Sequence, residues 1–350
     1  MPTKGLTERL ADGGTLVVAE GYLYEFERRG FLKAGAFVPE VVLEHPEQLR
    51  LLSEEFVHAG SDTVVAYTYY GHREKLRAIG REDDLEKLQR TALQIAREVA
   101  DKTGALMAGD ICNTTVYNKD DPETHREVMD MFKEQVEWAL EYNVDYIIGE
   151  TFNDFGEALL ALEAIKKYGK GVPAVITLAP SGAYRTFDDY LYGDACRKLE
   201  EAGAAVVGVN CNRGPKSMLP IVRDIVKCCK GPVACLPIPY RTTDEQPTMH
   251  SLKDTDTGKM AFPEDLPAWL CSRTQITSFA REAKEVGVRY IGLCCGNASY
   301  YTRILAEVYG RTPPASKYSP DMSQHFVYGD EKFAKKYFSD GLKAKYATNE

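Results

Sequence analysis

The sequence alternates short, β-rich apolar runs with longer amphipathic segments, and this alternation occurs eight times. The runs are nearly continuous in Val, Ile, Leu and Ala, as expected for strands that are covered on both faces. We predict strands over residues 16–19, 63–67, 105–109, 146–149, 174–177, 206–210, 232–236 and 290–294. The intervening segments place apolar residues three and four positions apart, which predicts helices. Eight strand–helix units favour a closed (β/α)8 TIM barrel of the α/β class.

An open, doubly wound sheet is the alternative arrangement for the same elements. No GxGxxG motif follows the first predicted strand, so a dinucleotide-binding fold has little support. We expect a barrel domain over residues 1–310 and a C-terminal arm over 311–350 that serves as an oligomerisation element. A long polar segment, residues 238–269, follows the seventh predicted strand, and long loops of this kind often carry function.

The chain has 350 residues and a formal net charge of -9. Such a surface repels phosphate backbones, so we expect no nucleic-acid partner. No apolar stretch approaches about 18 residues, so we expect no membrane association, and the N-terminus lacks the apolar core of a secretory signal. Nine cysteines in such a chain predict reduced thiols in the cytoplasm, which favours metal binding or thiol chemistry over a disulfide framework.

Polar and thiol residues gather at the predicted strand ends. In a (β/α)8 barrel the active site lies at the C-terminal ends of the strands, so these side chains are expected to converge. They are Glu20, Tyr69, Tyr70, Asp110 to Asn113, Glu150, Asn210, Cys211, Tyr240, Cys294 and Cys295.

Three cysteines in this set have the arrangement of a metal site. Cys211 follows the sixth predicted strand, and Cys294 and Cys295 lie at the end of the eighth. Three thiolates suit zinc at about 2.3 Å, and three protein ligands leave the fourth position open, as in catalytic sites. The alternative is three buried core cysteines, because free cysteine is among the most buried residue types.

Adjacent cysteines pose a geometric problem for such a site. Neighbouring residues on a regular strand point to opposite faces, so two adjacent thiols reach one ion only if the chain turns there. Gly296-Asn297 supplies a turn signal directly after the pair. A second pair, Cys228-Cys229, falls near the end of a predicted helix, and we interpret it as structural.

Two glutamates, Glu20 and Glu150, also end predicted strands. Because a buried carboxylate without a partner is costly, each is expected to meet an ammonium, a hydroxyl or backbone N–H groups. Recognition of a substrate amino group is one interpretation, and a salt bridge at the barrel rim is the other.

Aromatic residues cluster near the first two strand ends: Tyr22, Tyr24, Phe37, Tyr69 and Tyr70. Aromatic faces attract cations, and quaternary ammonium ligands bind in aromatic cages. Core packing is the alternative for several of them, and Tyr70, which lies past its strand, is the best cage candidate.

Several segments resemble the homocysteine S-methyltransferase family, and within it the betaine-dependent enzymes. They are ERRGFLKAGAFVPE, EHPEQLRLLSEEFVHAGSD, REVADKTGALMAGD, NVDYIIGETF, AGAAVVGVNCN, AREAKEVGVRYIGLCCGN and PPAS. The pairing of GVNC with a later G-x-CCG segment is specific to this family. The resemblance covers residues from about 6 to about 320.

This resemblance implies a zinc-dependent enzyme that moves a methyl group from an onium donor, a betaine-like quaternary ammonium or a sulfonium, to homocysteine, giving methionine and the demethylated donor. It also implies a homodimer or homotetramer. The zinc ligands then fall on Cys211, Cys294 and Cys295. Glu150 and Tyr70 are the expected catalytic residues. The expected substrate-binding residues are Glu20, Gly21, Tyr22, Phe37, Tyr70, Glu150, Thr151 and Asn210.

Three departures from the family pattern concern the donor side. The usual DGG is Glu20-Gly21-Tyr22, a cage tryptophan is replaced by Phe37, and a tyrosine is replaced by Thr151. We therefore expect a donor other than glycine betaine, with Tyr22 refilling part of the lost ring volume. A donor carboxylate would pair with Arg185 or Arg241.

Two alternatives stay open beside this hypothesis. One is a homocysteine methyltransferase that uses S-methylmethionine or S-adenosylmethionine as the donor. The other is a non-catalytic zinc or thiol sensor.

Overall fold

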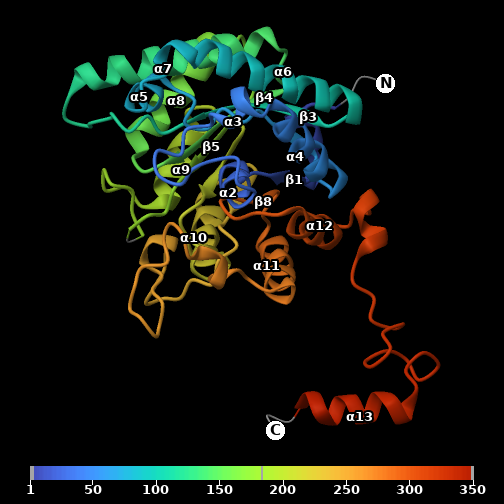
Figure 1. The fold of residues 1–350 in the computed structure, drawn as a ribbon. Helices are drawn as coiled ribbons and strands as arrows, with labels where there is room; N and C mark the ends of the chain where they lie inside the picture. Colours follow the sequence, from blue (N-terminus) through green and yellow to red (C-terminus); the bar gives the residue numbers. More distant parts are fainter. Residues whose placement is uncertain (1–3, 183, 348–350) are drawn as a thin grey trace. The chain divides into compact units, whose positions relative to one another are not determined.

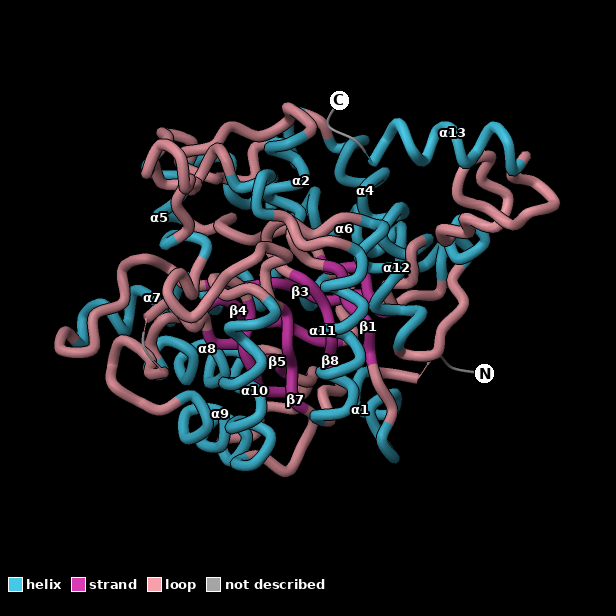
Figure 2. The backbone as a smooth tube through the Cα atoms, turned by 90° about the horizontal axis from the view of Figure 1, so that it is seen from below, coloured by secondary structure: helices cyan, strands magenta, loops and turns pink. Residues whose placement is uncertain are grey.

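A computed structural model describes residues 4–182 and 184–347. Its eight parallel strands close into a barrel in chain order, with helices outside them (Figures 1 and 2). The strands are β1 Leu16–Ala19, β2 Thr63–Val65, β3 Leu106–Cys112, β4 Tyr146–Phe152, β5 Ala174–Leu178, β6 Val206–Asn210, β7 Val233–Leu236 and β8 Tyr290–Leu293. The predicted (β/α)8 barrel is confirmed.

Helices connect successive strands and pack on the outside of the barrel (Figure 2). The α-helices are α1 Leu6–Leu10, α2 Tyr22–Arg28, α3 Val41–Glu44, α4 Pro46–His58, α5 Arg73–Ala78, α6 Leu85–Thr103, α7 Pro122–Glu141, α8 Phe155–Tyr168, α9 Tyr192–Glu201, α10 Pro215–Cys228, α11 Arg273–Val286, α12 Ser299–Val308 and α13 Lys336–Ala347. Short 3₁₀ turns are η1 Ala11–Gly13, η2 Glu82–Asp84, η3 Met249–Ser251, η4 Leu266–Trp269 and η5 Pro314–Tyr318.

Every strand residue is buried, which explains the continuous apolar runs. The inside of the barrel is packed, and one layer of polar side chains below its mouth is hydrogen-bonded. The Tyr146 hydroxyl donates to Thr63 Oγ1 at 3.0 Å and lies 3.1 Å from the Tyr290 hydroxyl, so three strands share one hydrogen-bonded layer. This layer closes the barrel beneath the strand ends that carry the candidate site.

Two strands extend three residues further than their apolar runs predict. β3 continues to Cys112 and β4 to Phe152, with an irregular register between Gly149 and Phe152. Glu150 and Thr151 therefore lie within a strand rather than after it. The reason is that Phe152 still pairs with Leu178 of β5, so the polar residues between are held in the ladder.

The described chain divides into two compact units between Pro313 and Pro314. The first unit is the barrel, and the second contains η5 and α13. Within the described residues, no helix is long and apolar enough to cross a membrane.

Candidate metal centre and its two cavities

Three cysteine sulfurs meet at the C-terminal mouth of the barrel. The Sγ atom of Cys295 lies 3.7 Å from that of Cys211 and 3.9 Å from that of Cys294. All three sulfurs lie within 4.8 Å of one another. The three residues predicted as zinc ligands are thus brought together, whereas Cys228 and Cys229 lie at the end of α10.

The chain reaches this arrangement by turning immediately after β8. The Asn297 N–H donates to the Cys294 carbonyl at 2.9 Å, and Gly296 has a φ of +94°. This turn removes the alternation that would send the adjacent thiols to opposite faces. A Cβ atom on Gly296 would lie 2.5 Å from the Tyr240 hydroxyl, so the turn requires glycine.

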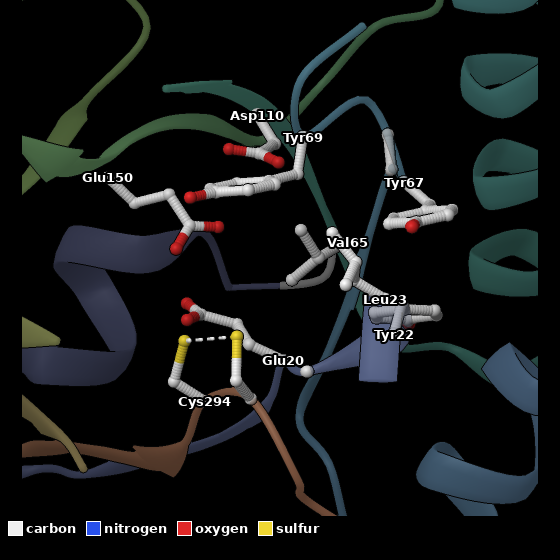
Figure 3. Close-up of a pocket in the computed structure, with 12 residues that line it drawn as sticks. Glu20, Tyr22, Leu23, Val65, Tyr67, Tyr69, Asp110, Glu150 and Cys294 are labelled. Atoms are coloured by element: carbon white, nitrogen blue, oxygen red, sulfur yellow. Dashed lines mark hydrogen bonds between the residues drawn. The ribbon is translucent and has the colours of Figure 1, made fainter. Parts of the chain in front are cut away.

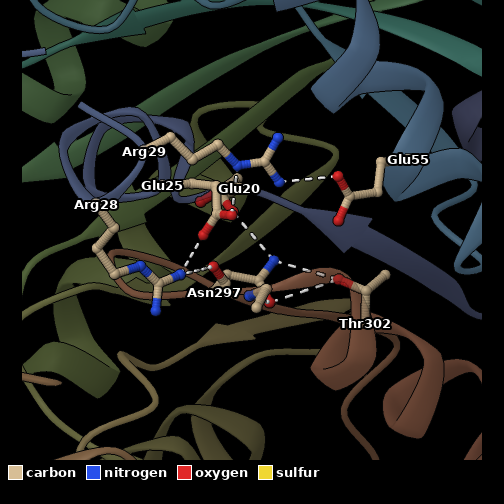
Figure 4. A network of polar contacts seen from close by, with 8 residues as sticks. Glu20, Glu25, Arg28, Arg29, Glu55, Asn297 and Thr302 are labelled. Atoms are coloured by element: carbon tan, nitrogen blue, oxygen red, sulfur yellow. Dashed lines mark hydrogen bonds and ion pairs between the residues drawn. The ribbon is translucent and has the colours of Figure 1, made fainter. Parts of the chain in front are cut away.

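A polar network holds the same turn against the segment after β1 (Figure 4). Asn297 Nδ2 donates to the Glu20 carbonyl at 3.1 Å, and Arg28 donates to the Asn297 carbonyl at 3.0 Å. Gly21 completes the close approach, since a Cβ atom there would lie 2.4 Å from the Cys294 carbonyl oxygen. Backbone contacts therefore fix the cysteine turn relative to Glu20.

The sulfur spacing fits a tetrahedral zinc ion. Thiolates about 2.3 Å from zinc in tetrahedral geometry lie about 3.8 Å apart, close to the distances found here. Hydrogen bonding with Cys294 and Cys295 holds the pKa of the Cys211 thiol well below its usual range, while hydrogen bonding with Cys211 raises the pKa values of Cys294 and Cys295. Three cysteine sulfurs at this spacing form the donor set of a zinc site.

A small cavity of about 30 Å³ lies on one side of the sulfurs (Figure 3). Its lining contains three carboxylates, two thiols and several aromatic rings. The lining residues are Glu20, Gly21, Tyr22, Leu23, Val65, Ala66, Tyr67, Tyr69, Asp110, Glu150, Cys294 and Cys295. Among these described residues there is no Lys, Arg or His.

Glu150 is held by neutral hydrogen-bond donors. Asn210 Nδ2 and Thr151 Oγ1 both donate to Glu150 Oε2, at 2.6 and 2.9 Å. Burial raises the Glu150 pKa to about 7, although these two hydrogen bonds act in the opposite direction. Asn210 Nδ2 also lies 3.8 Å from the sulfur of Cys294, so it links the carboxylate to the cysteine cluster.

Glu20 and Asp110 are buried without a comparable set of donors. Glu20 Oε2 and Asp110 Oδ1 have no hydrogen-bond partner among the described residues. Burial, together with the charge of Glu150, raises the pKa of both carboxyl groups. Oxygens of Glu20 and Glu150 lie within 4.8 Å of each other and of the Cys294 sulfur. A rim salt bridge does not describe these groups, and a cationic ligand would satisfy them.

A larger cavity of about 350 Å³ shares the lining residues Leu23, Tyr69 and Cys295 with the smaller one. Cys211 and Cys295 face it, together with an aromatic wall of Tyr24, Phe37, Tyr69, Tyr70 and Phe262. A neutral polar wall is formed by Asn113, Thr151, Asn153, Ser181 and Asn212, and Leu23, Phe187, Met249 and His250 complete the lining. This cavity combines aromatic faces with amide and hydroxyl groups.

Strained backbone concentrates around this larger cavity. Ten of the described non-glycine residues have positive φ angles, and five of them line the cavity: Phe37, Tyr70, Thr151, Cys211 and Asn212. Such conformations cost of order 1 kcal/mol or more each and persist where the surroundings enforce them. Backbone strain of this kind tends to gather at functional sites.

The predicted substrate-binding residues divide between the two cavities. Glu20, Gly21, Tyr22 and Glu150 line the smaller one, while Phe37, Tyr70 and Thr151 line the larger one. Asn210 is fully buried behind Glu150 and lines neither. The residue instead positions the carboxylate.

Three expectations about the donor side need correction. Tyr22 stacks on Tyr67 with centroids 5.6 Å apart and lines the smaller cavity, so it does not refill the aromatic cage. Arg185 donates to the Asp189 carbonyl and Arg241 to the Ala268 carbonyl, and neither lines the larger cavity. Both arginines use their guanidinium groups to hold loop backbone.

Several residues that line the two cavities have no role that the sequence alone predicts. Asp110 is expected only as a strand-end residue, yet it lines the smaller cavity. Met249, His250 and Phe262 come from the long segment 238–269 and line the larger cavity. The length and polarity of that segment are the signal that indicated function there, but they do not identify individual side chains.

Glu157, on α8, supports the loop after β3 and provides a test of burial energetics. Thr114 donates to Glu157 Oε1 through its N–H and its hydroxyl, at 2.7 and 2.6 Å, and burial raises the Glu157 pKa from 4.5 to about 7. Because the folded state binds this proton more tightly, the group lowers stability progressively as the pH rises through that window. Glu157→Gln keeps the accepting oxygen but has no group that ionises. The difference in free energy of unfolding between this variant and the wild type should therefore shift in favour of the variant by of order 2 kcal/mol between pH 4 and pH 8.

Urea unfolding at pH 4, 6 and 8 measures this difference. Glu163→Gln, at an exposed position on the same helix, is the matched control and should show no such pH dependence. Equal stability changes for Glu157→Gln at all three pH values would contradict the burial effect.

Comparisons with known proteins agree with these features. The family model described as homocysteine S-methyltransferase matches residues 11–309. Betaine–homocysteine S-methyltransferase 1 of Bos taurus is 35% identical over 314 residues, covering 87% of this chain and 74% of that protein. S-methylmethionine–homocysteine S-methyltransferase of Mus musculus is 34% identical, covering 90% of this chain and 85% of its own length.

Solved structures show the same fold. The metallated form of the homocysteine methyltransferase MmuM from Escherichia coli has a TM-score of 0.64 at 17% identity. The match covers 83% of this chain and 95% of that one. The oxidised form of the same enzyme has a TM-score of 0.64 at 18% identity.

Proposed function

The chain belongs to the homocysteine S-methyltransferase family, and from that premise we propose that it transfers a methyl group from an onium donor to the sulfur of homocysteine, giving methionine. The observation that carries the proposal is the three-sulfur cluster at the barrel mouth, whose sulfurs line both a small acidic cavity and a larger aromatic cavity. Two substrates of different shape and charge can therefore reach the sulfur cluster through these two cavities.

Cys211, Cys294 and Cys295 would hold the metal, and the fourth position of a tetrahedral zinc would stay open. Zinc, when bound there, supplies the chemistry of a Lewis acid that converts a coordinated thiol into the thiolate, which is the nucleophilic form.

The acceptor occupies the acidic side. Glu20 and Glu150 pair with the homocysteine ammonium, because both are buried beside Cys294 and neither is neutralised by a basic side chain. Asn210 and Thr151 fix the direction of the Glu150 carboxylate. Orientation of the acceptor in this way places its sulfur near the cysteine cluster, as in-line methyl transfer requires.

The donor occupies the aromatic side. A trimethylammonium or sulfonium head is too bulky for a cavity of about 30 Å³ but fits one of about 350 Å³. Tyr70 and Phe37 offer ring faces to the cation. The acceptor sulfur forms a bond to the methyl carbon as the bond to nitrogen or sulfur of the donor breaks. The donor leaves as a neutral amine or sulfide with that electron pair, so no general acid is needed.

The polar wall indicates which donors this cavity prefers. Its described lining contains no Lys or Arg, and Asn113, Asn153 and Asn212 supply neutral amides instead. We infer that the donor is an onium compound other than glycine betaine, with a bulkier, aromatic or sulfonium structure. A panel of onium donors with zinc-loaded protein and homocysteine, followed by mass measurement of the methylated thiol, tests the function and ranks the donors.

Restoring the missing rings should shift the donor preference. We expect Phe37→Trp combined with Thr151→Tyr to raise the relative rate with glycine betaine by about tenfold, since Trp is the stronger cation–π partner and Tyr adds a ring. Competition between glycine betaine and a sulfonium donor measures the ratio.

Thr151 also donates to Glu150, so its replacement has a second effect that must be separated. Thr151→Val removes the hydroxyl without adding a ring and is the control. An unchanged donor ratio in the double variant, or an equal change in Thr151→Val, would show that these positions do not select the donor.

The two alternatives make different predictions in the same donor panel. A preference for S-methylmethionine would support the activity named for the mouse relative. Stoichiometric zinc with no methyl transfer to any thiol would favour the sensor. The paired cavities support the enzyme, because a sensor does not require a second ligand site.

The free cysteines and the C-terminal arm bear on the cellular location and the oligomeric state of the protein. We propose a cytoplasmic enzyme, consistent with nine cysteines that are all free. We also propose that the C-terminal arm, residues 311–350, makes the contacts of a homodimer or homotetramer. In support of this, its described part exposes several large apolar side chains, namely Tyr318, Met322, Phe326, Tyr328, Phe333, Tyr337, Phe338 and Tyr346.

A further inference from the structure

The small acidic cavity contains one carboxylate more than the proposed homocysteine contact uses. Glu20, Asp110 and Glu150 all line it, and each is at least nine-tenths buried. Asp110 comes from β3 and Glu150 from the neighbouring strand β4. Three carboxylates without a basic side chain among the described lining residues form an unusually costly arrangement unless a cation binds there.

The strand register explains why Asp110 faces this cavity. Asp110 pairs with Ile148, two residues before Glu150 on β4. The preceding residue Gly109 faces outward, since a Cβ atom there would contact Ala139 of α7. Side chains alternate along a strand, so Asp110 points into the barrel. Figure 3 shows it on the Glu150 side of the cavity, opposite Cys294.

Unpartnered polar atoms converge on the same place. Glu20 Oε2, Asp110 Oδ1 and the Tyr67 hydroxyl are buried without a hydrogen-bond partner among the described residues, and all three residues line this cavity. Buried polar groups in proteins are nearly always paired, so three such groups in one cavity point to a ligand that carries hydrogen-bond donors.

Size and donor count limit what that ligand is. A cavity of about 30 Å³ holds a group the size of roughly one or two water molecules. A primary ammonium has this size and carries three N–H donors, whereas a quaternary ammonium is larger and carries none. The acidic cavity therefore matches the amino end of the acceptor and excludes the head group of the donor.

We propose that Asp110 is a further substrate-positioning residue, which completes a three-carboxylate cradle with Glu20 and Glu150 for the primary ammonium of the acceptor thiol. The proposal rests on the proposed function for the identity of the acceptor. It restricts the acceptors to thiols with a free primary amine and assigns part of that selectivity to a residue on β3.

Binding measurements on zinc-loaded protein test the cradle independently of catalysis. We expect Asp110→Asn to weaken binding of homocysteine by roughly tenfold or more in calorimetry, as expected for loss of a charged hydrogen-bond partner. The same loss is expected for 3-aminopropane-1-thiol, which has the ammonium but no carboxylate. Binding of 4-mercaptobutanoate, which lacks the ammonium, should be weak and unchanged by the substitution.

Two further variants keep the test decisive. Asp110→Ala removes the side chain rather than converting it to an amide, and it replaces Asp110→Asn if that variant does not fold. Glu157→Gln alters another buried carboxylate, outside the cavity lining, and should leave homocysteine affinity within about twofold of the wild type.

The cradle is overturned if homocysteine binds the Asp110 variant as tightly as the wild type, or if 4-mercaptobutanoate loses affinity by the same factor. The proposed function fails in a distinguishable way, namely if homocysteine binds but no onium donor yields a methylated thiol.

Discussion

Replacing Cys294 by alanine should abolish stoichiometric zinc binding and lower methyl transfer by at least about a thousandfold. Cys294 supplies one of the three sulfurs in the cluster, and two thiolates do not complete a stable tetrahedral zinc site. Its sulfur also lies within 4.8 Å of Glu20 and Glu150, where the acceptor is proposed to bind. Zinc content by mass spectrometry and turnover with homocysteine are the two measurements.

A second buried cysteine provides the control for this experiment. Cys235 lies in β7, is fully buried and is not part of the sulfur cluster. Cys235→Ala should cost a little stability through a small cavity but keep zinc and activity. Stoichiometric zinc with full turnover in Cys294→Ala would remove the basis of the proposed function.

The fold was predictable because its signal is local and repeated. Each strand is a short apolar run, and each run is buried on both faces. The meeting of the three cysteine sulfurs was predictable for a related reason, since the strand ends of a barrel converge at one mouth. Gly296 even indicated the turn that brings adjacent thiols together.

The side-chain partners inside the mouth were not predictable in the same way. In the sequence, Thr151 is notable because it replaces a tyrosine of the family pattern. In the structure, its hydroxyl donates a hydrogen bond to Glu150. Asn210 likewise stands out as a substrate contact but lies behind the carboxylate. The Asn210–Glu150 contact depends on how strands about 60 residues apart are placed in the barrel, and the Thr151–Glu150 contact lies in the irregular part of β4. No local sequence pattern encodes either arrangement.

Asp110 shows a further limit of sequence reasoning. The sequence places this carboxylate among the strand-end residues that are expected to converge at the barrel mouth, but it assigns the residue no role of its own. Its inward direction follows from the length of β3, which extends three residues beyond the apolar run that predicted it. The charge surplus of the cavity became visible only once all three carboxylates were placed together.

Glu150 is the residue for which charge and hydrogen bonding can be separated most cleanly. Both of its donors, Asn210 and Thr151, reach the same oxygen, Oε2. Glu150→Gln can therefore keep an accepting oxygen for both donors while removing the negative charge. We expect kcat/KM for homocysteine to fall about 100-fold in this variant, as expected when an ammonium loses its charged partner.

Glu150→Ala should have the larger effect, about a thousandfold, because it also leaves the buried Asn210 amide and the Thr151 hydroxyl without their acceptor. Zinc content decides how either loss is interpreted, since Glu150 lies close to Cys294. With zinc retained, a lower kcat/KM reports on the acceptor itself. A Glu150→Gln variant that retains zinc and processes homocysteine at the wild-type rate would mean that the ammonium binds elsewhere, and the acidic cavity would lose its proposed role while the metal centre kept its own.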